Sequence, residues 1–374
     1  MRQIFGISLL LCIFWACSSD NTEDSIDDQP IPISFDRGAM LTNWADNIII
    51  PSYEAFSAEV AIMNTTFNAF KADTSEENLI ALRAAWLSAY TAWQRVSQFE
   101  IGPAETVGLR LNMNIYPTDT EKIDGFVSSG SYDLSLSSNR DAKGFPALDY
   151  LINGLAEDDV AIVAKYSTGD KDALIAYTES VLTDIISLSE EVLLDWKQGY
   201  RDTFIANDGA SATASVDRLV NDYIFYYEKF LRAGKMGIPL GVFSGSTLPE
   251  NVEAFYKADV SNDLFLVGLQ AVQDFFNGKH YGKSTTGASL ATYLDDLNTV
   301  KDGEDLKTII NDQFNIARSK VVELGTFREE IENNNPPTQM LLAYDEVQRA
   351  VPLLKVDMVS AMSISIDFVD ADGD

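Results

Sequence analysis

The chain has 374 residues, with 27 lysines and arginines against 57 aspartates and glutamates. The formal net charge of −30 at pH 7 excludes nucleic acid as a partner, because binding to a phosphate backbone depends on cationic contacts. The same negative field concentrates metal cations and basic ligands near the surface, although an ordinary soluble exported protein is also expected to be acidic.

The first residues are typical of an export signal. Met1 and Arg2 form a positive start, and the apolar run at residues 4–16 is shorter than the about 20 residues that a transmembrane helix needs. A small residue then precedes Cys17, a pattern that resembles a bacterial lipoprotein cleavage site. We therefore predict a signal peptide at residues 1–16 and a lipid anchor on Cys17, with ordinary secretion as the alternative.

The cysteines and the next segment agree with a membrane anchor. Cys12 would leave with the signal peptide and Cys17 would be acylated, so no thiol remains for a disulfide or for thiolate chemistry. Residues 17–33 are rich in Ser, Asp, Glu and Pro and predict a disordered acidic tether. Its acidic start resembles the export tags of surface lipoproteins in some Gram-negative groups. This predicts a cell-envelope protein anchored to the outer membrane, on its periplasmic face or at the cell surface, where an outer-membrane protein is a candidate partner.

The rest of the chain predicts helices packed on helices. Between residues 79 and 96 apolar side chains recur at steps of three and four, and Trp86 and Trp93 are expected to fill the core. No long stretch alternates with the period of two that marks a strand. Further helices are expected at residues 173–194, 216–230, 262–276, 290–297, 305–323 and 339–365.

About 340 residues after the tether exceed one typical domain, so we predict two helical bundles, residues 34–200 and residues 201–374. Each half has a helix that ends near a Gly-Pro or Gly-Ile-Pro turn, at residues 102–103 and 237–239. This repetition favours a distant internal duplication in an all-α protein.

Residues 143–152 read Lys-Gly-Phe-Pro-Ala-Leu-Asp-Tyr-Leu-Ile. They resemble the signature of the imelysin-like family, in which a glycine is followed two places on by a histidine and three places later by a glutamate. Gly144 matches, whereas Pro146 stands in place of the histidine and Asp149 in place of the glutamate. Residues three apart on a helix can present two ligands to one metal ion, but proline has no donor atom. A metal site here would keep one carboxylate and lose its nitrogen ligand.

A structural role explains the same residues without a metal. Pro146 suits the first turn of a helix, where its missing N–H costs nothing, and Asp149 in that turn would favour the positive end of the helix dipole.

The resemblance extends from about residue 34 to residue 374. It includes the blocks at residues 92–103, 114–119, 235–241, 249–254, 354–357 and 370–374. The family is built as two similar helical halves with its motif in the cleft between them, so the resemblance implies a shared pocket at that interface.

If a hard cation binds there, such as iron, zinc or calcium, carboxylates must supply its ligands. The candidates near the matching blocks are Asp149, Glu100, Glu105 and Glu253. Each is equally explained as a helix-end charge or as a salt-bridge partner, for instance of Arg95 or Lys235, and exposed pairs of that kind contribute little.

Several other signatures fail on their spacing. Residues 278–284 read Gly-Lys-His-Tyr-Gly-Lys-Ser, but a phosphate loop has four residues between its glycines and follows a strand, so a surface loop is expected. His280 is the only histidine, which excludes a paired-histidine zinc site, and no Gly-x-Ser-x-Gly motif occurs to pair with it. Asp370, Asp372 and Asp374 are similar to the start of a calcium loop; a weak or partner-completed calcium site and a solvated acidic end are both open.

The resemblance implies a cell-envelope binding protein that takes part in the uptake of iron or another divalent metal. The loss of the histidine favours an alternative, a metal-free member that binds an oligosaccharide, a peptide or a protein partner in the cleft. Some members of the family have been called peptidases. This sequence supplies no recognisable nucleophile, base or catalytic metal set, so we do not expect enzyme activity.

Overall fold

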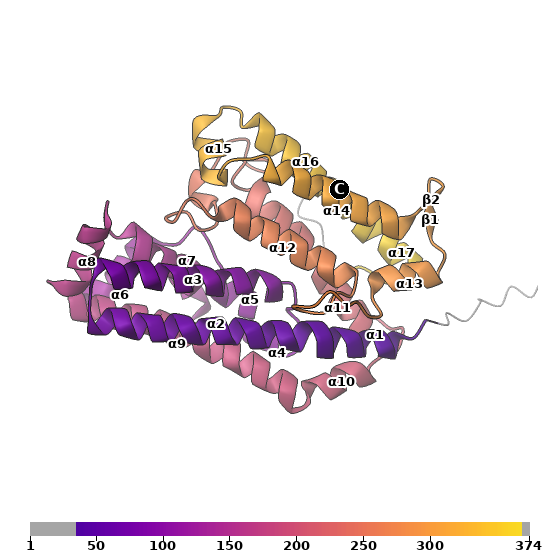
Figure 1. Cartoon of the computed structure of the whole chain (residues 1–374), viewed down its shortest axis with the longest axis horizontal. Coiled ribbons are helices and arrows are strands. Elements are labelled where there is room, and N and C mark those ends of the chain that lie inside the picture. The colour runs from indigo at the N-terminus through magenta and orange to yellow at the C-terminus, as the bar shows by residue number, and fades with distance from the viewer. Residues whose placement is uncertain (1–34, 369–374) are drawn as a thin grey trace, which may run out of the picture. The chain divides into compact units, whose positions relative to one another are not determined.

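The computed structural model describes residues 35–368, which fold mainly into helices (Figure 1). The predicted signal peptide, Cys17, the tether and the three aspartates at residues 370–374 lie outside the described residues. In the labels below, η marks a π-helix or a 3-10 helix.

The first elements are α1 (Arg37–Asn43), η1 (Trp44–Ile49), α2 (Ile50–Ala72), α3 (Glu76–Val96), α4 (Pro103–Val107), α5 (Leu109–Met113), α6 (Thr120–Ser129), η2 (Ser137–Ala142), α7 (Gly144–Asp149), η3 (Tyr150–Gly154), α8 (Asp159–Ser167), α9 (Lys171–Asp195), η4 (Trp196–Tyr200) and α10 (Arg201–Ala206). They are followed by α11 (Ser215–Phe225), η5 (Tyr226–Gly237), η6 (Pro249–Asn251), α12 (Ser261–Phe276), α13 (Leu290–Asp296), β1 (Val300–Lys301), β2 (Glu304–Asp305), α14 (Leu306–Val322), α15 (Phe327–Asn333), α16 (Thr338–Pro352), η7 (Leu353–Met358) and α17 (Val359–Ala361).

Helix α3 shows why the predicted helices form. The Ser75 side chain accepts a hydrogen bond from Asn78 N at its start, two glutamates occupy its first turn, and Arg95 lies in its last turn, which complements the helix dipole. Trp86 and Trp93 are buried, as the apolar period predicts. The all-α prediction is confirmed. Within residues 35–368 the named strands are β1 and β2, a short antiparallel hairpin.

The long helices pack side by side in one continuous series. Helix α2 contacts α9 and α3, α3 contacts α12, α12 contacts α14, and α14 contacts α16 (Figure 1). Residues 35–368 belong to a single compact unit. The contact of α3 with α12 therefore joins the two predicted bundles through shared core, and the division at residue 200 and the internal duplication stay predictions.

Two of the predicted helices change their geometry part-way, and the one at residues 339–365 does so where α16 passes into the π-helix η7. The run at residues 216–230 is α11 up to Phe225 and then becomes the π-helix η5, which extends to Gly237. A π-helix is wider than an α-helix and occurs often at functional sites. None of the helices in residues 35–368 has both the length and the apolar character needed to cross a membrane.

Candidate functional site

The motif at residues 144–149 forms helix α7. Gly144 starts it with a φ of 75°, and a Cβ added there would lie 2.3 Å from the carbonyl oxygen of Met113, so only glycine fits. Pro146 lies in the first turn, as the structural interpretation predicts. Asp149 is the last residue of α7 and not part of its first turn, so the expected role at the positive end of the helix dipole is wrong.

Asp149 instead holds a loop that is distant in sequence. Its Oδ2 accepts a hydrogen bond from Tyr256 N at 2.8 Å, and its Oδ1 accepts bonds from Lys257 N at 2.9 Å and Asn153 Nδ2 at 3.0 Å. Burial raises the pKa of Asp149 to about 7, although these hydrogen bonds act in the opposite direction. The carboxyl group therefore ties residues 256–257 to α7, and both of its oxygens are already engaged.

Glu253 is the centre of a buried polar cluster. It is 1% exposed, and its Oε1 accepts hydrogen bonds from Asn114 Nδ2 at 2.8 Å and Gln94 Nε2 at 3.1 Å. Its Oε2 forms an ion pair with Lys235, as the salt-bridge interpretation of this residue predicts. Burial lowers the pKa of Lys235, and the nearby Glu253 carboxylate opposes that shift. Tyr90 completes the cluster by donating its hydroxyl proton to Asn114 Oδ1.

Four of the sequence blocks that carry the family resemblance meet in this cluster. Gln94 comes from the block at residues 92–103, Asn114 follows α5, Lys235 lies on η5, and Glu253 follows η6. Segments that are far apart in the chain therefore converge on one carboxylate.

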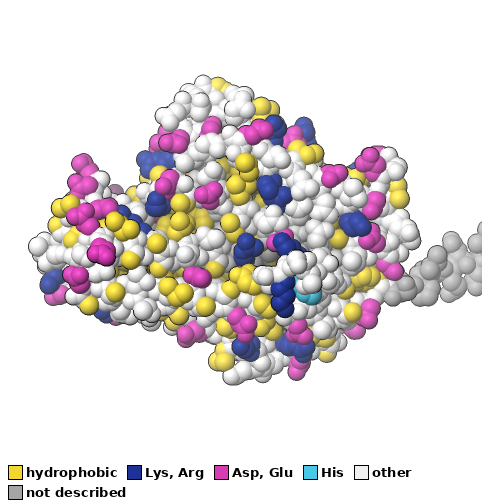
Figure 2. Space-filling view, viewed as in Figure 1, with side chains coloured by type: hydrophobic (Ala, Val, Ile, Leu, Met, Phe, Trp, Pro, Cys, Tyr) yellow, Lys and Arg dark blue, Asp and Glu magenta, His cyan; other side chains and the backbone are white. Residues whose placement is uncertain are grey.

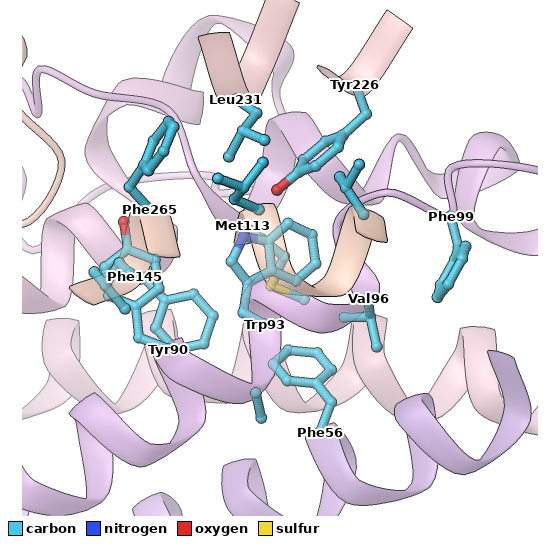
Figure 3. Packing of buried hydrophobic residues seen from close by; sticks show 14 of the residues in the cluster. Phe56, Tyr90, Trp93, Val96, Phe99, Met113, Phe145, Tyr226, Leu231 and Phe265 are labelled. Atoms are coloured by element: carbon cyan, nitrogen blue, oxygen red, sulfur yellow. The ribbon is translucent and has the colours of Figure 1, made fainter. Parts of the chain in front are cut away.

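A pocket with a volume of about 180 Å³ lies beside this cluster. We call it the Trp93 pocket. It is lined by Trp93, Gln94, Ser97, Arg110, Asn114, Ile115, Tyr116, Tyr226, Lys229, Phe230, Gly234, Lys235, Ile238 and Asn251. Trp93 packs on Phe56, with ring centroids 5.6 Å apart, and Figure 3 shows its indole nitrogen on the side of Tyr226. Aromatic rings thus form much of the wall, and η5 supplies one side of it.

Four polar side-chain atoms of the residues that line this pocket have no hydrogen-bond partner, namely Trp93 Nε1, Gln94 Oε1, the Tyr226 hydroxyl and Lys229 Nζ. Lys229 still forms an ion pair with Glu228 at 2.9 Å. Trp93 and Gln94 are 1% and 0% exposed. Buried polar groups in native proteins are nearly always paired. Trp93 Nε1 and Gln94 Oε1 are thus an unpaired donor and an unpaired acceptor on residues of one pocket wall.

The motif itself borders a smaller cavity of about 70 Å³. Pro146, Asp149 and Tyr256 line it, and Tyr116 lines both this cavity and the Trp93 pocket. The cavity beside the family motif and the Trp93 pocket therefore share Tyr116 as a lining residue.

The remaining carboxylate candidates belong to another cluster. Glu100 accepts a hydrogen bond from Arg110 N at 2.8 Å, and the guanidinium of Arg110 also pairs with Asp222 at 2.9 Å. Burial raises the pKa of Glu100 to about 7, against the effect of Arg110. Glu105 is half exposed and pairs with Arg218 at 2.5 Å.

Asp149, Glu253, Glu100 and Glu105 thus each have partners of their own. Residues 35–368 contain no group of three or more His, Cys, Asp or Glu side chains that could hold a metal ion. The four candidates are not brought together as one ligand set, and Pro146 contributes no donor to any of them.

The comparison with known families decides the relationship. A family model described as Imelysin matches residues 49–351. The chain belongs to the imelysin family. This confirms the resemblance read from the degenerate motif and its flanking blocks.

Other imelysins and their relatives agree with this assignment. Iron-regulated protein A of Synechococcus elongatus is 22% identical over 241 residues, which cover 60% of this chain and 62% of that protein. The crystal structure described as an iron-regulated protein A precursor from Parabacteroides distasonis has a TM-score of 0.70 at 15% identity and covers 86% of this chain and 95% of its own. An imelysin-like protein from Psychrobacter arcticum has a TM-score of 0.68 at 16% identity, with 89% and 97% covered. The two structures show that the fold is shared.

Sequence reasoning missed most of the polar residues in this imelysin's pocket. Trp93 was assigned to the core, where it does pack, but its unpaired nitrogen is visible only in three dimensions. Gln94 and Asn114 lie inside the blocks that match the family. For Gln94 the sequence offers one sign of a special role, which is an amide side chain on the buried, apolar face of a helix.

Proposed function

We propose that this chain is a cell-envelope binding protein that acts in iron acquisition, and that it binds an organic iron chelate through a ring held in the Trp93 pocket. The observation that carries the proposal is the pair of unpartnered buried atoms, Trp93 Nε1 and Gln94 Oε1, in one pocket wall. An unpaired buried polar group costs about 1–3 kcal/mol. A ligand that pairs with both atoms recovers that free energy.

The charges around the pocket support an organic ligand over a bare cation. The Glu253 carboxylate is already neutralised by Lys235, and Arg110 and Lys229 also line the wall. Hard cations need several oxygen ligands, and iron or zinc sites use nitrogen, sulfur or carboxylate donors. A chelator brings those donors with it, so the protein needs only to recognise the chelator.

The size and lining of the pocket support a ring. Its volume of about 180 Å³ is below the about 300–1,000 Å³ of sites for drug-sized ligands, so one ring enters and the rest of the chelate stays outside. Trp93, Tyr116 and Tyr226 offer aromatic faces and edges to such a ring. The link to iron is supported by the names of two relatives, iron-regulated protein A and its described precursor.

The test is a calorimetric and tryptophan-fluorescence titration of the mature chain, that is, the protein without the predicted signal peptide at residues 1–16. The probes are ferric 2,3-dihydroxybenzoate, the iron-free chelator, and ferric, ferrous, zinc and calcium ions alone. Trp93→Phe keeps an aromatic ring, although a smaller one than the indole, and removes the N–H, so it should weaken chelate binding by about tenfold, the effect of one good hydrogen bond. Trp196→Phe is the matched control, because Trp196 is equally buried with an unpartnered Nε1 and is not part of this pocket wall.

Saturable binding of a free metal ion that is lost in Asp149→Ala, with no binding of the chelate or the chelator, would overturn this proposal in favour of a direct metal site. A peptidase is not proposed, because the only histidine, His280, contacts Thr285 and not a serine or cysteine nucleophile.

For the cellular location we propose that Cys17 carries the lipid anchor that holds the protein to the outer membrane. The pattern around Cys17 in the sequence supports this. Incorporation of labelled palmitate by the wild-type chain and its loss in Cys17→Ala are the expected results, and labelling that persists in the variant would contradict the anchor.

A further inference from the structure

A second pocket, with a volume of about 350 Å³, is lined by a different set of residues from the Trp93 pocket. It lies between the end of α3, helix α12 and the loop at residues 278–284. Its polar lining includes Arg95, Gln98, Asp274, Lys279, His280 and Lys283. We call it the basic pocket.

The loop that closes this pocket is fixed by backbone contacts. Gly278 has a φ of 64°, and a Cβ there would lie 2.6 Å from the carbonyl oxygen of Gly287, so glycine is required. His280 N donates to Thr285 O at 2.9 Å, and Tyr281 N donates to Asn47 O at 2.8 Å, which holds the loop against η1. The sequence excluded a phosphate loop here, and the segment indeed follows helix α12 and not a strand. It still presents two lysines and a histidine from a defined backbone.

Positive charge exceeds negative charge in this pocket. Arg95, Lys279 and Lys283 line it, and Asp274 is the one acidic residue among its lining. Asp274 lies 3.3 Å from Lys279 and 3.9 Å from Arg95, so one carboxylate is shared by two cations. Lys283 is exposed at the rim. Figure 2 shows lysine and arginine side chains gathered beside the histidine around a hollow, on a chain whose net charge is −30.

Two further atoms of this pocket have no hydrogen-bond partner. Gln98 is 2% exposed, and its Oε1 is unpaired. His280 Nε2 is also buried and unpaired, whereas Nδ1 lies 2.9 Å from Thr285 Oγ1. When the Thr285 hydroxyl donates to Nδ1, Nε2 carries the proton and is a donor without a partner. The wall thus combines cations, a donor and an acceptor.

We propose that the basic pocket binds a small hydroxylated anion, with a phosphate or carboxylate group held by Arg95, Lys283 and His280 and a hydroxyl group donating to Gln98. Arginine and lysine are the residues that bind such oxyanions in proteins. The ligand needs a hydroxyl group because Gln98 Oε1 is a hydrogen-bond acceptor. Such an oxygen binds a donor and does not attract an anion. The volume lies within the range of small-molecule sites. This site is independent of the Trp93 pocket.

The test is calorimetry on the mature chain with four probes, namely glucose 6-phosphate, citrate, inorganic phosphate and glucose. Glucose 6-phosphate or citrate should bind, and the one that binds more tightly identifies the phosphate or the carboxylate group as the preferred anion. Inorganic phosphate should bind more weakly, glucose should not bind, and affinity should fall as salt rises. Lys283→Gln should weaken binding by about tenfold, the effect of one charge-assisted hydrogen bond.

The matched control is Lys320→Gln, which removes an exposed lysine of α14 that pairs with Glu323 away from this pocket. It should leave the affinity unchanged. Because His280 is the only histidine, its ring signals in an NMR spectrum report directly on this pocket and should shift with the bound anion. The proposal is overturned if none of the three anions saturates the chain, if both lysine variants weaken binding equally, or if the histidine signals stay in place. Equal affinity for inorganic phosphate and glucose 6-phosphate would overturn the hydroxyl contact with Gln98.

Discussion

The Glu253 cluster and the basic pocket use charge in opposite ways. Around Glu253 the carboxylate has its own ammonium partner, Lys235, and two amide donors, so the buried charge is compensated within the protein. In the basic pocket one carboxylate, Asp274, is shared by Lys279 and Arg95. The Glu253 cluster holds segments of the chain together. The basic pocket has more positive than negative charge, which suits the anionic ligand proposed above. Proximity of charged residues is therefore a weak guide to function until their partners are counted.

The largest effect is expected from breaking the buried pair. Lys235→Met leaves the Glu253 carboxylate buried and without its cation, which should lower the free energy of unfolding by about 3–5 kcal/mol. Urea denaturation measures this loss. The double variant Lys235→Met with Glu253→Gln should recover most of it, because no uncompensated charge remains. Lys283→Gln in the basic pocket should change stability by less than about 0.5 kcal/mol. Equal losses in the free energy of unfolding for the Lys235 and Lys283 variants would contradict this difference between the Glu253 cluster and the basic pocket.

The next effect concerns pH and the carboxyl group of Glu100. Its pKa is raised from 4.5 to about 7 in the folded chain, so the folded state holds a proton that the unfolded state has released between these two values. Raising the pH through this window removes that proton at a cost, and stability falls. Relative to Glu100→Gln, the wild type should lose roughly 3 kcal/mol between pH 4.5 and 7. Denaturation curves of both proteins across that range test the sign, and a constant difference would show that Glu100 titrates normally.

A smaller effect is expected at Asp149. In Asp149→Asn one carboxylate oxygen becomes an NH₂ donor, so the backbone N–H of Tyr256 or that of Lys257 loses its acceptor. The loss in free energy of unfolding should be about 1–3 kcal/mol, and amide exchange at these two positions should speed up. Unchanged protection of both amides in the variant would mean that the Asp149 side chain does not hold this loop.

The sequence could predict the helices but not the partners of their polar residues. The apolar period along α3 encodes which face is buried, so the burial of Trp86 and Trp93 follows from local spacing. Asp149 and Tyr256 are 107 residues apart, and nothing in either segment encodes that one accepts from the other. Gln98 follows α3 and His280 lies in the loop after α12, and neither segment encodes that the two residues line one pocket. The imelysin resemblance located the blocks that meet at Glu253, because a family pattern carries tertiary information that periodicity lacks.

The last and smallest effect concerns the histidine that the motif lacks. Pro146→His restores a nitrogen donor beside Asp149, and a family-type metal site would then be expected to reappear if the carboxylate were free. Both Asp149 oxygens already accept hydrogen bonds from Tyr256, Lys257 and Asn153, and a metal would have to replace them. We therefore expect no saturable binding of zinc or ferrous ions to Pro146→His by calorimetry. One-site binding that disappears when Asp149→Ala is added would show that a metal ion can replace these hydrogen bonds. The missing histidine, and not the contacts of Asp149 with the loop, would then explain why the motif binds no metal.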